Sequence, residues 1–139
     1  MTIEVQRLNN AYHMEARNEA GATLQMDNNL AHGGSNLALT PMQLLLAGIG
    51  GCSTIDIIDI LKKQRQELQD IKVTINGERE ANKEPSLFQT IHLHYKLYGN
   101  IEDSKAQQAL KLSLDKYCSV AKTLEATAKI TYTYEIISE

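Results

Sequence analysis

The stretch Pro41-Met42-Gln43-Leu44-Leu45-Leu46-Ala47-Gly48-Ile49-Gly50-Gly51-Cys52 decides the fold, because it predicts a long central helix that carries a cysteine. Thr40 can cap this helix, Pro41 suits its first position, and Gln43 completes a capping box. Apolar residues then recur at helical spacing, which predicts a helix over residues 40–66. Its first half is apolar nearly all round, a pattern typical of a buried helix.

Three glycines and several charged residues refine this picture of the central helix. Gly48, Gly50 and Gly51 each destabilise a helix interior by about 0.8–1.0 kcal/mol relative to alanine, a cost tolerated where another backbone or a ligand comes close. We therefore expect this helix to cross another helix at short range beside Cys52, either from the same chain or from a second subunit. From Asp56 onward charged residues accumulate, so we expect that end of the helix to emerge into water.

Strand patterns lie on both sides of the central helix. Alternating apolar residues predict strands over 2–8, 12–17, 23–26, 71–75, 91–98 and 128–137, with helices beginning near Glu102 and Cys118. The order β-β-β-α-β-β-α-α-β is an α+β arrangement. We expect one domain over residues 1–139, made of a β-rich part (1–39), the central helix (40–66) and a β-β-α-α-β part (70–139).

Composition excludes several classes of function. The 139 residues include 14 Lys and Arg against 17 Asp and Glu, a net charge of −3 that disfavours binding to nucleic acid. The first residues lack the pattern of a signal peptide. We expect no membrane span, since no apolar run approaches the roughly 18 residues it requires. The predicted location is the cytoplasm, where thiols are kept reduced.

The two cysteines, Cys52 and Cys118, carry the chemistry that the sequence suggests. They are too few for a disulfide scaffold and too far apart for a zinc knuckle, so a reversible thiol–disulfide couple is the plausible chemistry if they meet in the fold. We predict no metal and no cofactor. His92 and His94 share a strand face at a spacing that can hold a metal, but no third ligand is apparent, and we interpret this face as solvated.

The Pro-x-Gln-Leu-Leu-x-Ala-x-x-x-Gly-Cys helix and the later Tyr117-Cys118-Ser119-Val120-Ala121 helix start resemble the OsmC/Ohr superfamily of osmotically inducible and organic hydroperoxide resistance proteins. The segments around residues 61–66 and 116–121 are most similar to its YhfA-like branch. The resemblance implies an OsmC-like fold that forms an intertwined homodimer. In it, two long central helices pack between antiparallel sheets, and each active site draws residues from both subunits.

The resemblance also implies a reaction. The cysteine at the position of Cys52 attacks an organic hydroperoxide and becomes a sulfenic acid, and the cysteine at the position of Cys118 condenses with it to a disulfide. An external dithiol then reduces the disulfide. The protein would therefore be a thiol peroxidase that protects against oxidative stress, with a small-molecule hydroperoxide as its substrate.

One position departs from the peroxidase pattern. A peroxidatic cysteine must be a thiolate and needs a nearby cation, which in these peroxidases is an N-terminal arginine held by a glutamate. Arg7 and Arg17 are the candidates for that cation. The glutamate position corresponds to Met42, which is uncharged.

Two alternatives follow from the loss of that glutamate. The first is an OsmC-like protein that binds or senses a hydrophobic small molecule, without appreciable peroxidase activity. The second is ester or thioester hydrolysis by Cys52, which is weaker because the sequence places no histidine base beside this residue.

Overall fold

A computed structural model describes residues 1–138, and its contacts divide the chain into two compact units, Met1–Leu45 and Leu46–Glu139. Each unit is described by itself. The single domain expected over residues 1–139 stays a prediction.

The first unit is built on a small antiparallel sheet. Its strands are β1 (Ile3–Arg7), β2 (Met14–Asn18) and β3 (Thr23–Met26), in the order β1-β2-β3. The 3-10 helix η1 (Leu30–His32) interrupts the loop that follows. All three strands lie within residues 1–39.

The central helix α1 runs over Pro41–Lys63. Its predicted capping box is present: the Thr40 backbone N–H donates to Gln43 Oε1 at 2.9 Å, and the Gln43 N–H donates to Thr40 Oγ1 at 3.3 Å. The helix ends before the predicted residue 66, because Arg65 adopts a left-handed conformation with φ of 59° and a strand begins directly afterwards.

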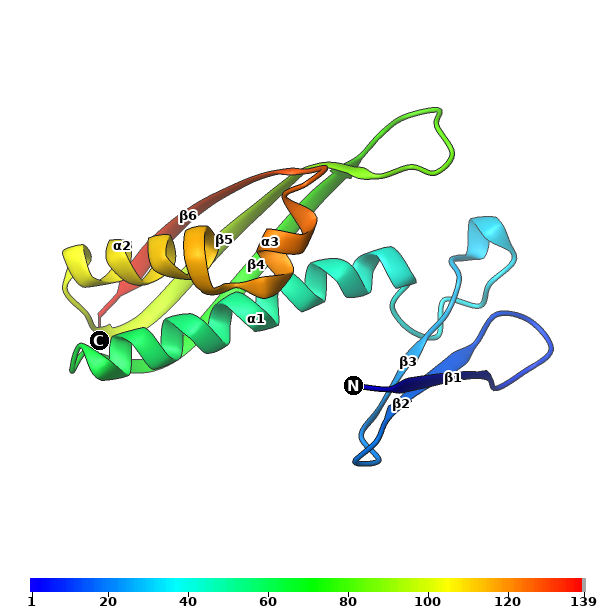
Figure 1. Cartoon of the computed structure of the whole chain (residues 1–139), viewed down its shortest axis with the longest axis horizontal. Coiled ribbons are helices and arrows are strands. Elements are labelled where there is room, and N and C mark those ends of the chain that lie inside the picture. Colours follow the sequence, from blue (N-terminus) through cyan, green and yellow to red (C-terminus); the bar gives the residue numbers. More distant parts are fainter. Residues whose placement is uncertain (139) are drawn as a thin grey trace. The chain divides into compact units, whose positions relative to one another are not determined.

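The second unit contains a second sheet and three short helical segments (Figure 1). The strands are β4 (Glu67–Arg79), β5 (Phe88–Asn100) and β6 (Lys129–Ile137), in the order β4-β5-β6. Between β5 and β6 the chain forms α2 (Asp103–Leu112), the π-helical turn η2 (Ser113–Tyr117) and α3 (Ser119–Leu124).

This second sheet corrects the expectation of purely antiparallel sheets. β4 and β5 are antiparallel, but β5 and β6 are parallel, with Leu93 opposite Tyr132 and Tyr95 opposite Tyr134. The physical reason is the connection between them. A helical crossover returns the chain to the end where β5 began, so the next strand must run in the same direction.

The core of the second unit lies between one face of this sheet and the helices. α1 contributes a stripe at every fourth residue, and β5 contributes every second residue, as the two periodicities require. The fully buried positions are Ile49, Ser53, Ile57 and Leu61 on α1 and Ile91, Leu93, Tyr95 and Leu97 on β5. On α2, Ala106, Ala109 and Leu110 are buried in the same way.

The glycines of α1 serve different purposes, which partly corrects the expected helix crossing. A Cβ on Gly50 would lie 2.7 Å from Ile75 Cδ1, so this glycine lets α1 approach strand β4 rather than another helix. Gly48 faces Val120 of α3 at an ordinary contact distance of 3.8 Å. Gly51 has nothing within 4 Å and is exposed.

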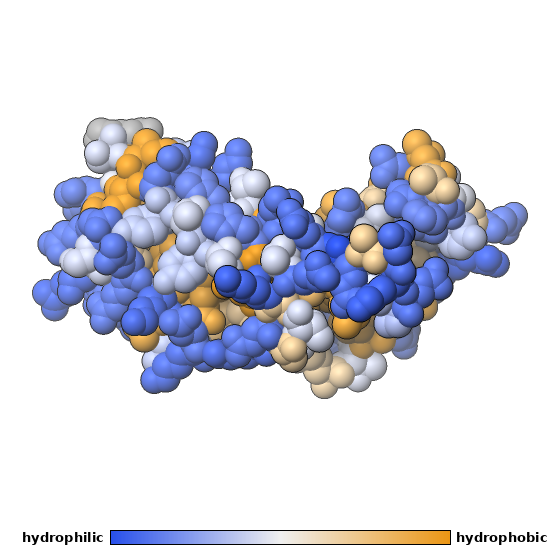
Figure 2. Space-filling view, turned by 90° about the horizontal axis from the view of Figure 1, so that it is seen from above, coloured by the Kyte–Doolittle hydropathy of each residue, from blue (hydrophilic) through white to orange (hydrophobic). Residues whose placement is uncertain are grey.

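The opposite face of α1 is apolar and is left exposed by the described residues of the second unit. Ile55 is 63% exposed and Ile58 41%, and both Ala47 and Gly51 are exposed on the same side. Only 28% of the most apolar 18-residue window of α1 is buried, which corrects the expectation of burial all round. Figure 2, a view from above, shows hydrophobic residues at the surface among hydrophilic ones.

The composition of α1 also corrects the expectation about membrane-spanning segments. This helix is long and apolar enough to cross a membrane, contrary to the prediction from the sequence. The core helix of a water-soluble protein passes the same test, so this finding is weak support for a span.

Candidate functional site

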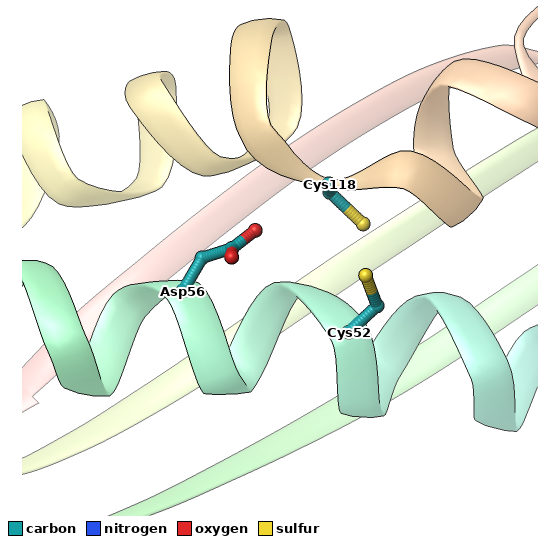
Figure 3. Close-up of side chains that lie close together, drawn as sticks. All are labelled: Cys52, Asp56 and Cys118. Carbon is teal, nitrogen blue, oxygen red and sulfur yellow. The ribbon is translucent and has the colours of Figure 1, made fainter.

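The structure brings the two cysteines together. Cys52 lies in the middle of α1, and Cys118 lies between η2 and α3. Their sulfur atoms point toward one another (Figure 3). These two Sγ atoms and a carboxylate oxygen of Asp56 all lie within 4.8 Å of one another, and both cysteines are free thiols. Two free thiols this close can form a disulfide once their sulfur atoms approach to bonding distance.

The π-helical turn η2 positions Cys118. The backbone N–H of Cys118 donates to the Ser113 carbonyl at 2.7 Å. The backbone of Cys118 is extended rather than helical, so this residue is the N-cap of α3. The Ala121 N–H donates to Cys118 Sγ at 3.4 Å. This bond orients the sulfur, and it confirms the predicted start of a helix at Cys118.

Asp56 is the third member of the cluster. It follows Cys52 by one helical turn, and residues four apart share a helix face. The carboxylate is half-buried and accepts a hydrogen bond from the Ser113 hydroxyl at 3.0 Å. The end of α1 emerges into water as expected, with Asp59, Lys62 and Lys63 exposed, whereas Asp56 is partly covered by Ser113 of η2.

A buried polar pair lies beneath the thiols. Ser53, the neighbour of Cys52, forms a hydrogen bond of 2.6 Å with the Tyr95 hydroxyl, and Ser53 Oγ also donates to the Ile49 carbonyl at 2.7 Å. Burial raises the pKa of Tyr95 above its ordinary value, and Cys118 and Asp56 raise it further. The phenol is therefore a neutral partner that fixes α1 on β5.

The surroundings of Cys118 disfavour its thiolate. Burial raises the pKa of this thiol to about 11, and the neighbouring Cys52 and Asp56 add to the rise. The Ala121 N–H lowers the pKa of the same thiol but is outweighed. The amide at the start of α3 therefore favours the thiolate of Cys118, but burial has the larger effect.

A surface hollow adjoins the cluster on the side of Asp56. Its volume is about 490 Å³, and it is lined by residues of α1 and of the α2–η2 region: Asp56, Asp59, Ile60, Lys63, Gln64, Leu112 and Tyr117. The lining mixes apolar and charged groups of both signs. A small molecule that enters this hollow would meet the Asp56 carboxylate, which belongs to the cysteine cluster.

The predicted arginines lie in the other unit. Arg7 ends β1, and Arg17 on β2 forms an ion pair with Glu15 at 3.1 Å. Met42 stands in the first turn of α1 and also belongs to that unit. A role for Arg7 or Arg17 beside Cys52 stays a prediction.

The histidine pair on β5 lies on the sheet face opposite Leu93 and Tyr95. His92 Nδ1 forms a hydrogen bond of 2.7 Å with Thr131 Oγ1, and His94 Nδ1 forms one of 2.7 Å with Thr133 Oγ1. Both imidazoles are half-exposed. These bonds to β6 support the interpretation of a solvated face rather than a metal site.

Comparison with known proteins places the fold and the cluster in a family. The OsmC-like protein family matches residues 33–133. The chain is also 38% identical over 120 residues to Protein YhfA of Escherichia coli K12, covering 86% of each chain. The chain belongs to the OsmC-like family. The resemblance stated from the sequence, including its YhfA-like branch, is confirmed.

Solved structures agree with this assignment. A hypothetical protein from Aquifex aeolicus VF5 is 33% identical to this OsmC-like protein, with a TM-score of 0.85 over 99% of this chain and 96% of its own. The organic hydroperoxide resistance protein OsmC from Legionella pneumophila is 19% identical, with a TM-score of 0.72 over 97% of both chains. The likeness to the Legionella pneumophila protein shows that the two proteins share a fold.

Sequence reasoning found the two cysteines and missed their polar neighbours. Asp56 had a usable signal, because Cys52 and Asp56 are spaced four apart on a predicted helix. Ser113 and Tyr95 had none, since each becomes part of the cluster only through the packing of η2 and β5 on α1.

Proposed function

We propose that this protein reduces organic hydroperoxides with Cys52 and Cys118 as a redox pair, and so protects the cell against oxidative stress. The observation that carries the proposal is the approach of the two sulfurs, which face one another from elements far apart in the sequence. Solved relatives that share the fold include a protein named for organic hydroperoxide resistance, which supports the same chemistry.

The proposed reaction proceeds in three balanced steps. The Cys52 thiolate attacks one oxygen of ROOH, the O–O bond breaks, and ROH leaves after it takes up a proton, while sulfur is oxidised to a sulfenic acid. The Cys118 sulfur then displaces water from that sulfenic acid and forms the disulfide. A dithiol reductant exchanges with the disulfide, restores both thiols and is itself oxidised.

The burial of the two thiols suits these roles. Cys52 is partly accessible, as a residue that meets the peroxide must be, whereas Cys118 is buried and meets only its neighbours. The first step still needs a cation, and we propose that Arg7 or Arg17 supplies it. The described part of the second unit places Asp56, an anion, beside the pair.

The uncovered face of α1 supports the homodimer as part of this proposal. Ala47, Gly51, Ile55 and Ile58 form an apolar stripe along a helix already buried on its other side. Two such stripes would cover each other in an intertwined dimer, and the small residues would allow close approach. Light scattering should then give a mass twice that of one chain. Ile55→Lys should lower this mass toward that of the monomer, whereas the control Ala126→Lys, at an exposed position away from the stripe, should leave it unchanged.

Consumption of cumene hydroperoxide tests the redox proposal. The reduced protein, with a dithiol such as dihydrolipoamide, should consume the hydroperoxide catalytically. Cys52→Ser should abolish consumption, because the attacking sulfur is gone. Cys118→Ser should permit a single oxidation of Cys52 and block the disulfide-dependent cycle.

The matched control is Ser119→Ala, which changes an exposed residue beside Cys118 and should retain activity. Consumption that is equal in the wild type and in Cys52→Ser would refute the proposal. So would the absence of consumption with every dithiol tested, provided that both thiols titrate as free in the starting protein.

Binding or sensing of a hydrophobic small molecule is the second candidate. The hollow of about 490 Å³ beside the cluster favours it, because Ile60, Leu112 and Tyr117 give the lining an apolar part. In that case a ligand should co-purify or raise the melting temperature, and Cys118→Ser should keep binding. The cytoplasmic location and the absence of membrane and nucleic-acid partners are proposed for either function.

A further inference from the structure

We propose that Cys52, Asp56 and Cys118 form a binding site for a thiophilic divalent metal ion, and that Zn²⁺ is the ion that fits best. The proposal departs from the expectation of no metal that the sequence alone suggested. It does not depend on the peroxidase proposal, because metal binding requires only the reduced cluster.

The donor atoms are already close to the positions that zinc requires. Two thiolates and one carboxylate around a tetrahedral zinc ion lie about 3.8 Å apart for the sulfur pair and about 3.6 Å apart for sulfur and oxygen, given ordinary bond lengths. In this structure the three donors lie within 4.8 Å of one another. Contraction by at most about 1.2 Å would complete the arrangement.

The scaffold holds these ligands in place. Cys52 and Asp56 lie one turn apart on a rigid helix, and the 2.7 Å bond from the Cys118 N–H to the Ser113 carbonyl fixes the third ligand. Ser113 also donates its hydroxyl to Asp56 Oδ2 at 3.0 Å, which leaves Oδ1 available. Such hydrogen bonds to a ligating carboxylate are typical of protein metal sites.

The charge and chemistry of the donors select the metal. Two thiolates and a carboxylate concentrate negative charge, which a divalent cation would neutralise. Thiolate sulfur favours Zn²⁺ over Mg²⁺ and Ca²⁺, while the hard carboxylate disfavours Cu⁺. Three protein ligands leave the fourth tetrahedral position to water or another small molecule, which the hollow beside Asp56 can admit.

Zinc binding would deprotonate both thiols. Each thiol that coordinates the ion releases its proton, so one Zn²⁺ displaces two protons and no electron is transferred. A disulfide between Cys52 and Cys118 has no thiolate left to offer. Zinc binding and disulfide formation therefore exclude each other, and Zn²⁺ should slow the oxidation of the pair.

Metal titration of the reduced full-length protein tests this site. Zn²⁺ measured against a chromophoric chelator should bind at one ion per chain. Co²⁺ should produce a sulfur-to-cobalt charge-transfer band together with the intense visible bands of tetrahedral coordination. Oxidation to the Cys52–Cys118 disulfide should abolish both signals, and a dithiol should restore them.

Asp56→Asn is the decisive variant. Asp59→Asn is its control, because this exposed carboxylate of α1 lines the same hollow but is not one of the three donors. Asp56→Asn should weaken zinc binding at least about tenfold, whereas Asp59→Asn should bind as the wild type does. Equal affinity in Asp56→Asn and Asp59→Asn would overturn the three-residue site, as would the absence of a charge-transfer band in the reduced protein. Circular dichroism of each variant verifies its fold, so that loss of binding is not confused with unfolding.

Discussion

Two carboxylates, Asp27 in the first unit and Asp56 in the second, have opposite surroundings. Asp27 is 1% exposed and accepts backbone N–H bonds from Asn28 at 2.7 Å, Leu37 at 3.1 Å and Ser35 at 3.3 Å. Asp56 accepts one hydroxyl bond, from Ser113, and otherwise faces sulfur. Asp27 accepts several backbone amide bonds and so holds its loop together. Asp56 accepts only one hydroxyl bond, so its carboxylate can still accept a hydrogen bond or bind a metal ion beside the thiols.

The largest expected effect concerns stability. Asp27→Ala should lower the melting temperature by several degrees, because the amides of residues 28, 35 and 37 lose their common acceptor inside the loop. Hydrogen exchange should show lost protection at Ser35 and Leu37. Asp56→Ala should change the melting temperature far less, since only the Ser113 hydroxyl loses a partner. Equal losses in the two variants would remove the distinction between these carboxylates.

The second effect concerns thiol reactivity. In the reduced, metal-free protein, Asp56→Asn should modestly accelerate alkylation of Cys118 near pH 9. Burial is the main cause that raises the pKa of this thiol, and removing the smaller contribution of the Asp56 charge lowers that pKa. Mass spectrometry of iodoacetamide-treated protein, compared with Asp59→Asn, measures the rate at Cys118. Unchanged rates in Asp56→Asn would show that this charge does not act on the thiol.

The smallest expected effect is a change in the stability of the folded protein at acid pH. The Leu37 N–H is the main cause that lowers the pKa of Asp27 below its ordinary value of 3.8. A lowered pKa stabilises the folded state above that value, and the contribution is lost as the pH falls through the folded-state pKa. Chemical denaturation between pH 5 and about pH 2 should therefore show a smaller decline for Asp27→Asn than for the wild type. Parallel declines would contradict this role of Asp27.

The sequence predicted those parts of the fold that depend on local patterns. The capping box at Thr40 and Gln43, the order of strands and helices, and the helix start at Cys118 are all encoded by neighbouring residues. The parallel pairing of β6 with β5 could not be predicted, because it depends on where the α2–α3 crossover delivers the chain. The partial burial of Asp56 could not be predicted for a similar reason, because it depends on the packing of η2 against α1.

In the candidate site, too, the sequence predicted what depends on local motifs and not what depends on packing. Two cysteines in distinctive motifs suggested a pair, and the structure places their sulfurs as neighbours. The polar groups around them, Ser113 above and Tyr95 below, come from elements whose contacts with α1 no local pattern specifies. Ile55 and Ile58 belong to the apolar pattern that predicted a buried helix, but the structure leaves both side chains exposed, because composition does not specify which face of a helix its neighbours cover.

Mapping the disulfide after oxidation tests the central claim most directly. The reduced protein would be treated with one equivalent of cumene hydroperoxide, alkylated, digested without reductant and analysed by mass spectrometry. The account predicts a Cys52–Cys118 crosslink, formed within a single chain, as the main product. Both cysteines recovered as alkylated thiols, or a crosslink only between separate chains, would contradict it.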